Sequence, residues 1–272
     1  MPETTTRRSV LRALGAGMVA GSLGAWSLDA YVDTLTIERH ELRLPRWDAD
    51  GFRVAVIADL HMNNARQLAR AHKACRMASA EKPDLIVVVG DFINFTRADM
   101  AQSFAEALSP LGEAGCPVLG VLGNHDYWSR FPERVIEAIA ASPVRLLRNE
   151  LVDVDGVQVA GIDDAIVSRY RLDFFPKQSS ARSLIALLHE PDFADEMPRH
   201  VSLQLSGHSH GGQVCLPGGV PIKPPPFGEK YVAGFFESTP APLYVTRGVG
   251  TTGPDFRLFC RPEVSVLTLR SA

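Results

Sequence analysis

Three short apolar segments in the first half of the chain constrain its fold more than any other feature. Residues 52–58, 83–89 and 117–122 are rich in Val, Ile and Leu, and each is followed by a segment that reads as a helix, at 68–80, 100–111 and 132–141. Strands that are hydrophobic without interruption and alternate with helices are typical of parallel strands covered by helices. The first half therefore predicts a parallel sheet.

The second half adds further strands. We expect them at 144–147, 150–154, 157–161, 183–188, 201–205, 243–247 and 263–269, and an edge strand at 34–44 enters the domain. Asp155-Gly156 predicts a hairpin turn between two of these strands. Two mixed sheets packed face to face, with helices outside, are the α/β arrangement that this order favours.

The sequence of the N-terminal segment predicts that the protein is exported. Arg7-Arg8 precede an uncharged run from Ala13 to Leu28, which is typical of a twin-arginine signal. We expect residues 1–30 to be a signal or an anchor and residues 31–272 to form one domain. The twin-arginine translocation machinery would then deliver the protein to the periplasm or to the outer face of the cytoplasmic membrane. An ordinary secretory signal or an uncleaved anchor is the alternative.

Charge and cysteine content exclude some classes of protein. The net charge of −3 gives no reason to expect nucleic-acid binding. The four cysteines, Cys75, Cys116, Cys215 and Cys260, do not have the spacing of a zinc site or a disulfide framework. We interpret them as mostly buried free thiols.

Polar side chains of metal-ligand type stand where the predicted strands end. They are Asp59 and His61, Asp91, Asn124, His189, and then His208 and His210 between glycines. Carboxylate, amide and imidazole donors without thiolates suit a divalent ion such as Mn, Fe, Zn or Co. Seven candidates on five segments exceed the needs of one ion, so we expect two ions that share one carboxylate.

The same residues carry a family resemblance. Asp59-x-His61, Gly90-Asp91, Gly123-Asn124-His125-Asp126, His189 and Gly207-His208-x-His210 resemble the motifs of the calcineurin-like metallophosphoesterase superfamily. The resemblance implies a four-layer α/β/β/α sandwich with a two-metal centre. It also implies hydrolysis of a phosphodiester, phosphomonoester or pyrophosphate by a metal-bridging hydroxide.

The resemblance assigns a role to each residue. Asp59, His61 and His210 would hold the first metal, Asp91 would bridge, and Asn124, His189 and His208 would hold the second. His125 would act at the leaving group as a general acid or hydrogen-bond donor. Asp126 would orient His125.

The C-terminal third is similar to an exported or membrane-associated bacterial branch of this superfamily. The similarity lies in Gly211-Gly212-Gln213, 230–234, 247–250 and 260–263. Some members of that branch hydrolyse UDP-2,3-diacylglucosamine, so a lipid-linked or cell-envelope substrate is favoured. The apolar residues of loop 216–236, with Tyr170, Leu172, Phe174 and Phe175, would form a rim that meets a membrane or an acyl chain, or else simply pack the loop.

Other polar residues have weaker claims. Asp163 and Asp164 would approach the site or serve as a loop or cap, with the loop or cap favoured. One of Asn63, Asn64 and Arg66 would touch substrate phosphate, or all three belong to a solvated loop, which is favoured. Arg247 would contact phosphate or serve the structure. Two alternative functions fit the same sequence. One is a non-catalytic metal-binding envelope scaffold, and the other is a membrane-recruited lipid-binding module.

Overall fold

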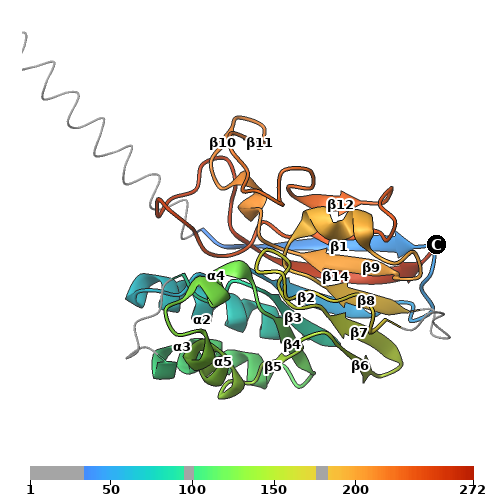
Figure 1. Cartoon of the computed structure of the whole chain (residues 1–272), viewed down its shortest axis with the longest axis horizontal. Coiled ribbons are helices and arrows are strands. Elements are labelled where there is room, and N and C mark those ends of the chain that lie inside the picture. Colours follow the sequence, from blue (N-terminus) through green and yellow to red (C-terminus); the bar gives the residue numbers. More distant parts are fainter. Residues whose placement is uncertain (1–33, 95–100, 176–182) are drawn as a thin grey trace, which may run out of the picture.

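Two six-stranded sheets form the centre of the protein (Figure 1). The computed structural model describes residues 34–94, 101–175 and 183–272. The predicted signal at 1–30 lies outside these residues. Among the described residues, no helix has both the length and the apolar character that crossing a membrane requires.

The first sheet has the order β1-β14-β2-β3-β4-β5. Its strands are β1 (Thr36–Leu44), β14 (Glu263–Ser271), β2 (Arg53–Ile57), β3 (Leu85–Val89), β4 (Val118–Val121) and β5 (Arg145–Leu146). Strands β2 to β5 are mutually parallel, β1 is parallel to β14, and β14 is antiparallel to β2. The predicted parallel sheet and its edge strand β1 are confirmed.

The second sheet has the order β12-β13-β9-β8-β7-β6. Its strands are β12 (Gly234–Phe236), β13 (Leu243–Val245), β9 (Leu203–Ser206), β8 (Leu184–Leu187), β7 (Val157–Gly161) and β6 (Glu150–Val154). The inner four are parallel and the two edge strands are antiparallel, so both sheets are mixed as predicted. Strands β10 (Cys215–Leu216) and β11 (Val220–Pro221) form a small hairpin that projects from the body (Figure 1).

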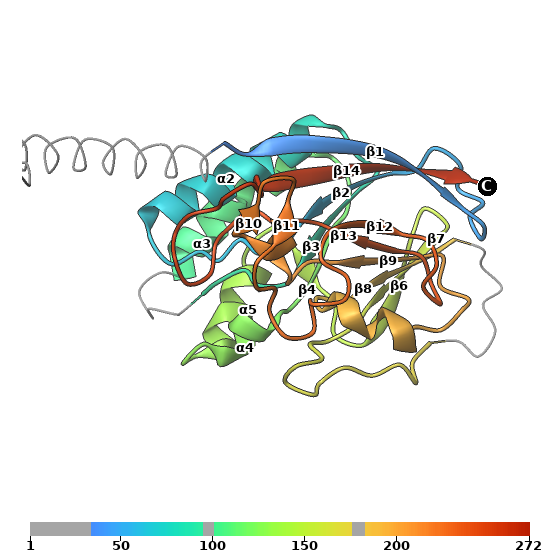
Figure 2. The same cartoon turned by 90° about the horizontal axis from the view of Figure 1, so that it is seen from above.

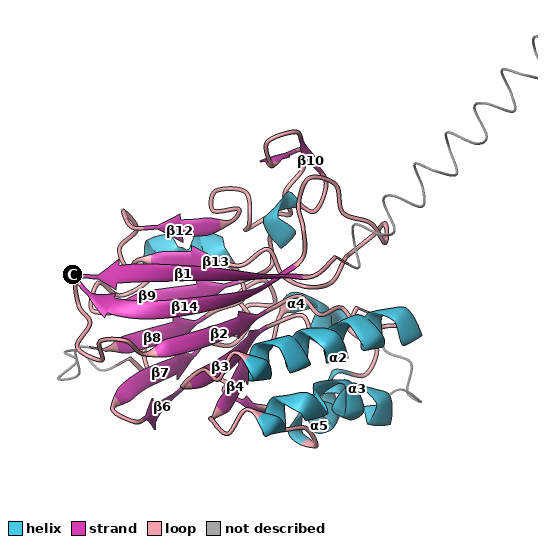
Figure 3. Ribbon diagram, turned by 180° about the vertical axis from the view of Figure 1, so that it is seen from behind, coloured by secondary structure: helices cyan, strands magenta, loops and turns pink. Residues whose placement is uncertain are grey.

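Helices cover the outer face of the first sheet (Figure 3). They are α2 (Ala65–Ala80), α3 (Ala101–Leu108), the 3₁₀ segment η1 (Ser109–Glu113), α4 (Asn124–Trp128) and α5 (Pro132–Ala140). Helix α2 begins three residues before the predicted 68, because the Asn64 side chain accepts a hydrogen bond from Gln67 N at 3.0 Å and caps it. Helix α4 was not predicted, because five residues are too few to show a helical period.

The first-sheet strands are buried on both faces, which explains their unbroken apolar sequence. In β2, Ala55 and Ile57 pack under the helices, whereas Val54 and Val56 face the second sheet. The layer between the sheets also contains Leu187 and Leu205 from the second sheet. Figure 2 shows the two sheets as separate layers, and this shared core fixes them against each other.

We expected α-helices on the outer face of the second sheet, but a different layer covers it. Among the described residues, loops and the 3₁₀ helix η2 (Pro191–Glu196) pack there instead of α-helices. The connection between β8 and β9, residues 188–202, contains only that 3₁₀ segment. Tyr170, Leu172, Phe174 and Phe175 pack into this layer, so for these four the loop-packing interpretation holds.

The cysteines have the predicted character. All four are free thiols, and three of them are buried.

Candidate metal centre

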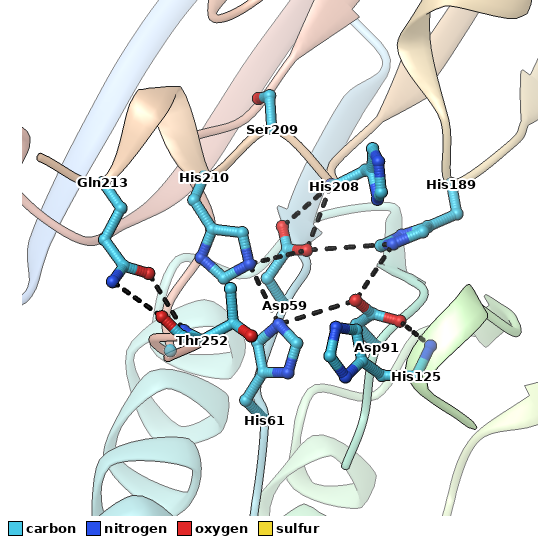
Figure 4. A network of polar contacts seen from close by, with 12 residues as sticks. Asp59, His61, Asp91, His125, His189, His208, Ser209, His210, Gln213 and Thr252 are labelled. Carbon is cyan, nitrogen blue, oxygen red and sulfur yellow. Dashed lines mark hydrogen bonds and ion pairs between the residues drawn. The ribbon is translucent and has the colours of Figure 1, made fainter. Parts of the chain in front are cut away.

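The parallel strands of both sheets deliver their C-terminal ends to one place (Figure 4). Asp59, Asp91 and Asn124 follow β2, β3 and β4, while His189 follows β8 and the pair His208 and His210 follows β9. All seven predicted ligands, His61 included, are buried. Sites in open parallel sheets lie at this edge because loops from several strands meet there.

Six of these seven side chains, all but Asn124, form two groups within each of which the ligand atoms lie within 4.8 Å of one another, and a third group joins His61 and Asp91 to His125. In the first group, His210 Nε2 lies 2.9 Å from His61 Nε2 and 3.6 Å from Asp59 Oδ1. In the second, which also contains His208, His189 Nε2 lies 3.2 Å from Asp91 Oδ2. Asp91 Oδ2 is also 3.5 Å from His61 Nε2, so the Asp91 carboxylate lies between the groups.

Hydrogen bonds set the tautomers of two imidazoles. His189 Nδ1 lies 2.8 Å from the carbonyl oxygen of Val89, and His208 Nε2 lies 2.8 Å from that of Pro226. A carbonyl oxygen only accepts, so both nitrogens donate. The other nitrogen of each ring, Nε2 of His189 and Nδ1 of His208, is then free to bind a cation.

Burial and neighbouring charges shift the pKa values of the side chains in the site. Burial raises the pKa of Asp59 to about 7 and lowers the pKa of His61 to about 3 and that of His208 to about 4. Burial opposes the charge on His189, but the facing carboxylates of Asp91 and Asp59 raise its pKa well above the usual value. The pocket thus keeps His61 and His208 as neutral lone-pair donors and favours positive charge beside the carboxylates.

Two buried polar atoms have the character of metal ligands. Asn124 Oδ1 accepts no hydrogen bond from the described residues, and the neighbours of Asn124 in the sequence, Gly123 and His125, both approach the Asp91 carboxylate. His189 Nε2 likewise has no hydrogen-bonding partner of its own in the described part of the chain. Unsatisfied buried groups are costly unless a ligand completes them. The donor set of carboxylate, amide oxygen and imidazole fits divalent metal ions.

The backbone of the site is strained. Asp59, His61, Asp91, His208 and His210 all have positive φ, between 47° and 66°. Each non-glycine residue in this region costs about 1–2 kcal/mol. Strain of this kind persists only where the surrounding structure enforces it, and it concentrates at functional sites.

Backbone hydrogen bonds between the loops enforce that geometry. Asp59 N donates to Gly90 O at 3.1 Å, His61 N to Asp91 O at 3.0 Å, and Gly207 N to His189 O at 3.1 Å. His208 N donates to Asp59 Oδ1 at 3.0 Å, which ties a loop of the second sheet to a carboxylate of the first. The positions of the side chains are therefore coupled through the main chain.

Glycines allow the close approach. A Cβ on Gly207 would lie 2.7 Å from Asp59 Oδ2, and a Cβ on Gly123 would lie 2.6 Å from Asp91 N and collide with the Asp91 carboxylate. These two close approaches explain the glycines that precede Asn124 and His208 in the sequence motifs.

His125 lies beside the cluster. Its ring makes an edge contact with that of His61 at 4.8 Å between centroids, and its backbone N–H donates to Asp91 Oδ1 at 2.9 Å. His125 also forms a group with His61 and Asp91 that is close enough for metal binding. The geometry is thus compatible with contact to substrate or with ligation.

Asp126 makes hydrogen bonds to the main chain. Its two carboxylate oxygens accept from the backbone N–H groups of Gly123 and Ile93, at 2.9 and 3.1 Å. Asp126 therefore braces the loops after β3 and β4, and its role in orienting His125 stays a prediction. A short helix beginning at Asn124 turns the carboxylate toward these amides.

The residues with weaker claims have structural partners. Asp163 binds Tyr127 and Arg148, and Asp164 accepts from Val167 N. Arg247 pairs with Glu38 and Glu263, and Arg66 pairs with Asp255. These contacts favour the structural interpretation, and the loop interpretation of Asn64 gives way to a helix cap.

Sequence reasoning missed Arg257. This arginine is fully buried, and its guanidinium donates to Gly250 O at 2.7 Å and to His210 O at 3.1 Å. It thus holds the His210 turn against the Gly250 loop. A single arginine in a loop has no periodicity or partner in the sequence, so no pattern could identify it.

Comparison with known proteins agrees with this geometry. The profile of the calcineurin-like phosphoesterase family matches residues 52–212. The chain is 30% identical to the uncharacterized metallophosphoesterase YkuE of Bacillus subtilis, over 98% of each chain. It is 31% identical to an uncharacterized metallophosphoesterase of Aquifex aeolicus, over 93% of this chain and 98% of the relative, and 29% identical to the phosphodiesterase YaeI of Escherichia coli, over 97% and 99%.

The close approach of Gly123 to Asp91 leads to a test. Gly123→Ala should lower metal affinity about 10- to 100-fold, because the added methyl displaces the Asp91 carboxylate. Gly123 has an ordinary φ of −116°, so backbone strain does not complicate the change. Metal content by mass spectrometry after dialysis is the measurement. Gly112→Ala, whose Cβ would meet only Pro143, is the control and should keep its metal. Equal metal content in both variants would contradict the assignment.

Proposed function

The chain belongs to the calcineurin-like phosphoesterase family of metal-dependent phosphoester hydrolases, and on this basis we propose that it hydrolyses its ester at a centre of two divalent ions. The observation that supports two ions is the presence of two ligand groups on either side of the Asp91 carboxylate. Asp59, His61 and His210 would hold one ion. Asn124, His189 and His208 would hold the other, and Asp91 would contact both.

The chemistry divides between the ions and the protein. Divalent ions bound there would supply a water of lowered pKa as nucleophile and neutralise charge on the phosphoryl oxygens. The buried carboxylates and the hydrogen-bonded imidazoles of His189 and His208 would hold the ions and in this way set the position of the phosphoryl group. No side chain needs to attack phosphorus.

His125 would work at the leaving group. The His125 ring makes an edge contact with the ring of His61. Its centroid lies 5.2 Å from that of the half-exposed Trp128 side chain, on the side of the cluster that faces solvent. From there it would donate a proton or a hydrogen bond to the departing oxygen.

The substrate is a phosphodiester, phosphomonoester or pyrophosphate, and a relative of similar length is named a phosphodiesterase. We further propose that the protein acts in the periplasm or at the outer face of the cytoplasmic membrane on a lipid-linked or cell-envelope ester. The paired arginines and the apolar run that follows them support export.

The central test is turnover with metal. The manganese-loaded protein should hydrolyse bis-p-nitrophenyl phosphate, and Asp91→Asn should lose most of that activity and part of its metal, because the shared carboxylate is weakened. Asp173→Asn, which changes a carboxylate at the surface, serves as the control and should match the native protein. A native protein that binds metal without turnover would favour the non-catalytic scaffold.

A second variant separates catalysis from metal binding. His125→Ala should keep its metal and lose about 10²–10⁴-fold in turnover, which is the usual scale for removing a general acid. The exposed His72 provides a control in His72→Ala, which should change neither quantity. Loss of metal from His125→Ala would instead make His125 a ligand, as its group with His61 and Asp91 allows.

Export has its own test. Replacement of both Arg7 and Arg8 by Lys should retain the protein in the cytoplasm, because twin-arginine translocation recognises that pair. Arg12→Lys is the matched control and should leave export unchanged. Cell fractionation with immunoblotting gives the distribution, and export of the double variant would point to the ordinary secretory route.

A further inference from the structure

An apolar pocket of about 410 Å³ opens beside the metal centre. It lies between the loop after β9, the connection that follows β11, and the loop before β14. The residues that line it include His210, Val214, Ile222, the run Pro224–Pro226, and Pro254. His210 is a proposed metal ligand, so the pocket and the centre share a wall.

One wall of the pocket is fixed by the other histidine of the same motif. The His208 Nε2–H donates to Pro226 O at 2.8 Å, which attaches the proline run to the metal site. A Cβ on Gly228 would lie 3.2 Å from Ser209 Cα, so the loop also packs closely on that motif. The proline wall therefore moves with the site.

Gln213 fixes the opposite wall. Its Nε2 donates to Thr252 O at 2.9 Å and to Pro254 O at 3.1 Å, and its Oε1 accepts from Thr252 N at 2.9 Å (Figure 4). Gln213 is buried and has a positive φ of 55°, which only such a closed set of bonds would maintain. The pocket is thus preformed on both sides.

The chemistry of the lining selects an apolar ligand. The lining includes one lysine, Lys223, but its surface is predominantly carbon, and both amide atoms of Gln213 are already hydrogen-bonded to the loop. A sugar or another hydroxylated group would lose its water there and gain few partners. The volume lies within the range of small-molecule sites, and the exposed side chain of Ile222 extends the apolar surface of the pocket outward.

We propose that this pocket binds the hydrocarbon substituent of the ester whose phosphoryl group is held at the metal centre. The proposal rests on the proposed function and names the substrate class as phosphoesters that carry an alkyl or acyl chain. Because the chain and the phosphoryl group bind on opposite sides of His210, the pocket positions the ester for hydrolysis as well as adding affinity.

A homologous series of esters tests the proposal. The manganese-loaded full chain is assayed with p-nitrophenyl alkyl phosphodiesters from methyl to octyl, below their aggregation concentrations. Each buried methylene should raise kcat/KM about two- to fourfold, so the octyl-to-methyl ratio should be about one hundred or more.

Two hairpin variants locate the effect. Ile222→Asp places a charge in the pocket lining and should reduce the octyl-to-methyl ratio at least about tenfold. Leu216→Asp makes the same change on the same hairpin outside the lining and should keep the ratio within about twofold. Ile222 and Leu216 are 59% and 53% exposed, so neither variant should prevent folding. A ratio near one in the native protein, or an equal loss in both variants, overturns the proposal.

A binding measurement separates this proposal from the proposed function. Calorimetry with octylphosphonate and methylphosphonate on the same metal-loaded protein needs no turnover. Tighter binding of octylphosphonate, reduced in Ile222→Asp but not in Leu216→Asp, supports the pocket even if no ester is hydrolysed. Equal binding of both phosphonates overturns the pocket even if every ester is hydrolysed.

Discussion

The interaction on which the site depends is the burial of two carboxylates among four imidazoles at the meeting edge of two sheets. Asp59 and Asp91 lie on the first sheet, and His189, His208 and His210 come from the second, so the attraction between them spans the core. Buried carboxylates this close repel each other and must be neutralised. Divalent ions held by these side chains would supply that neutralisation. The sheet packing therefore fixes the centre, and the centre in turn needs a cation.

The strained backbone conformations and the hydrogen bonds that hold them lie in the same loops. Five of the predicted ligands have left-handed backbones, and the loops that carry them are hydrogen-bonded to one another between the two sheets. Asp126 and Arg257 support this network, because Asp126 accepts from main-chain N–H groups and Arg257 donates to main-chain carbonyls of the loops, with a further contact to the His210 ring. A scaffold without a bound group would have little reason to keep so many unfavourable conformations in one place.

The segment from His208 to Gln213 also builds the apolar pocket beside the metal centre. His208 holds the proline run and Gln213 holds the loop of Thr252 and Pro254, so two residues of one short segment build both walls of the apolar pocket. The aromatic residues at 170–175 have a different task, since they cover the outer face of the second sheet where no α-helix is described. The apolar residues at 170–175 thus pack against the second sheet, whereas those at 222–226 line an open pocket.

The sequence by itself determined most of the sheet-forming segments, the α/β class and the set of ligand-type residues. It could do so because unbroken apolar strands and the polar residues at their ends are local patterns. Only the tertiary structure decided that the expected loop at 216–236 carries the short strands β11 and β12 and the end of β10, that the cysteines are unpaired, that the outer layer of the second sheet is mostly loop, and that Arg257 supports His210. These outcomes depend on which main-chain groups are left unpaired when distant loops meet, and no local pattern records that. The pocket beside His210 likewise exists only because residues 208–213, 222–226 and 252–254 pack together.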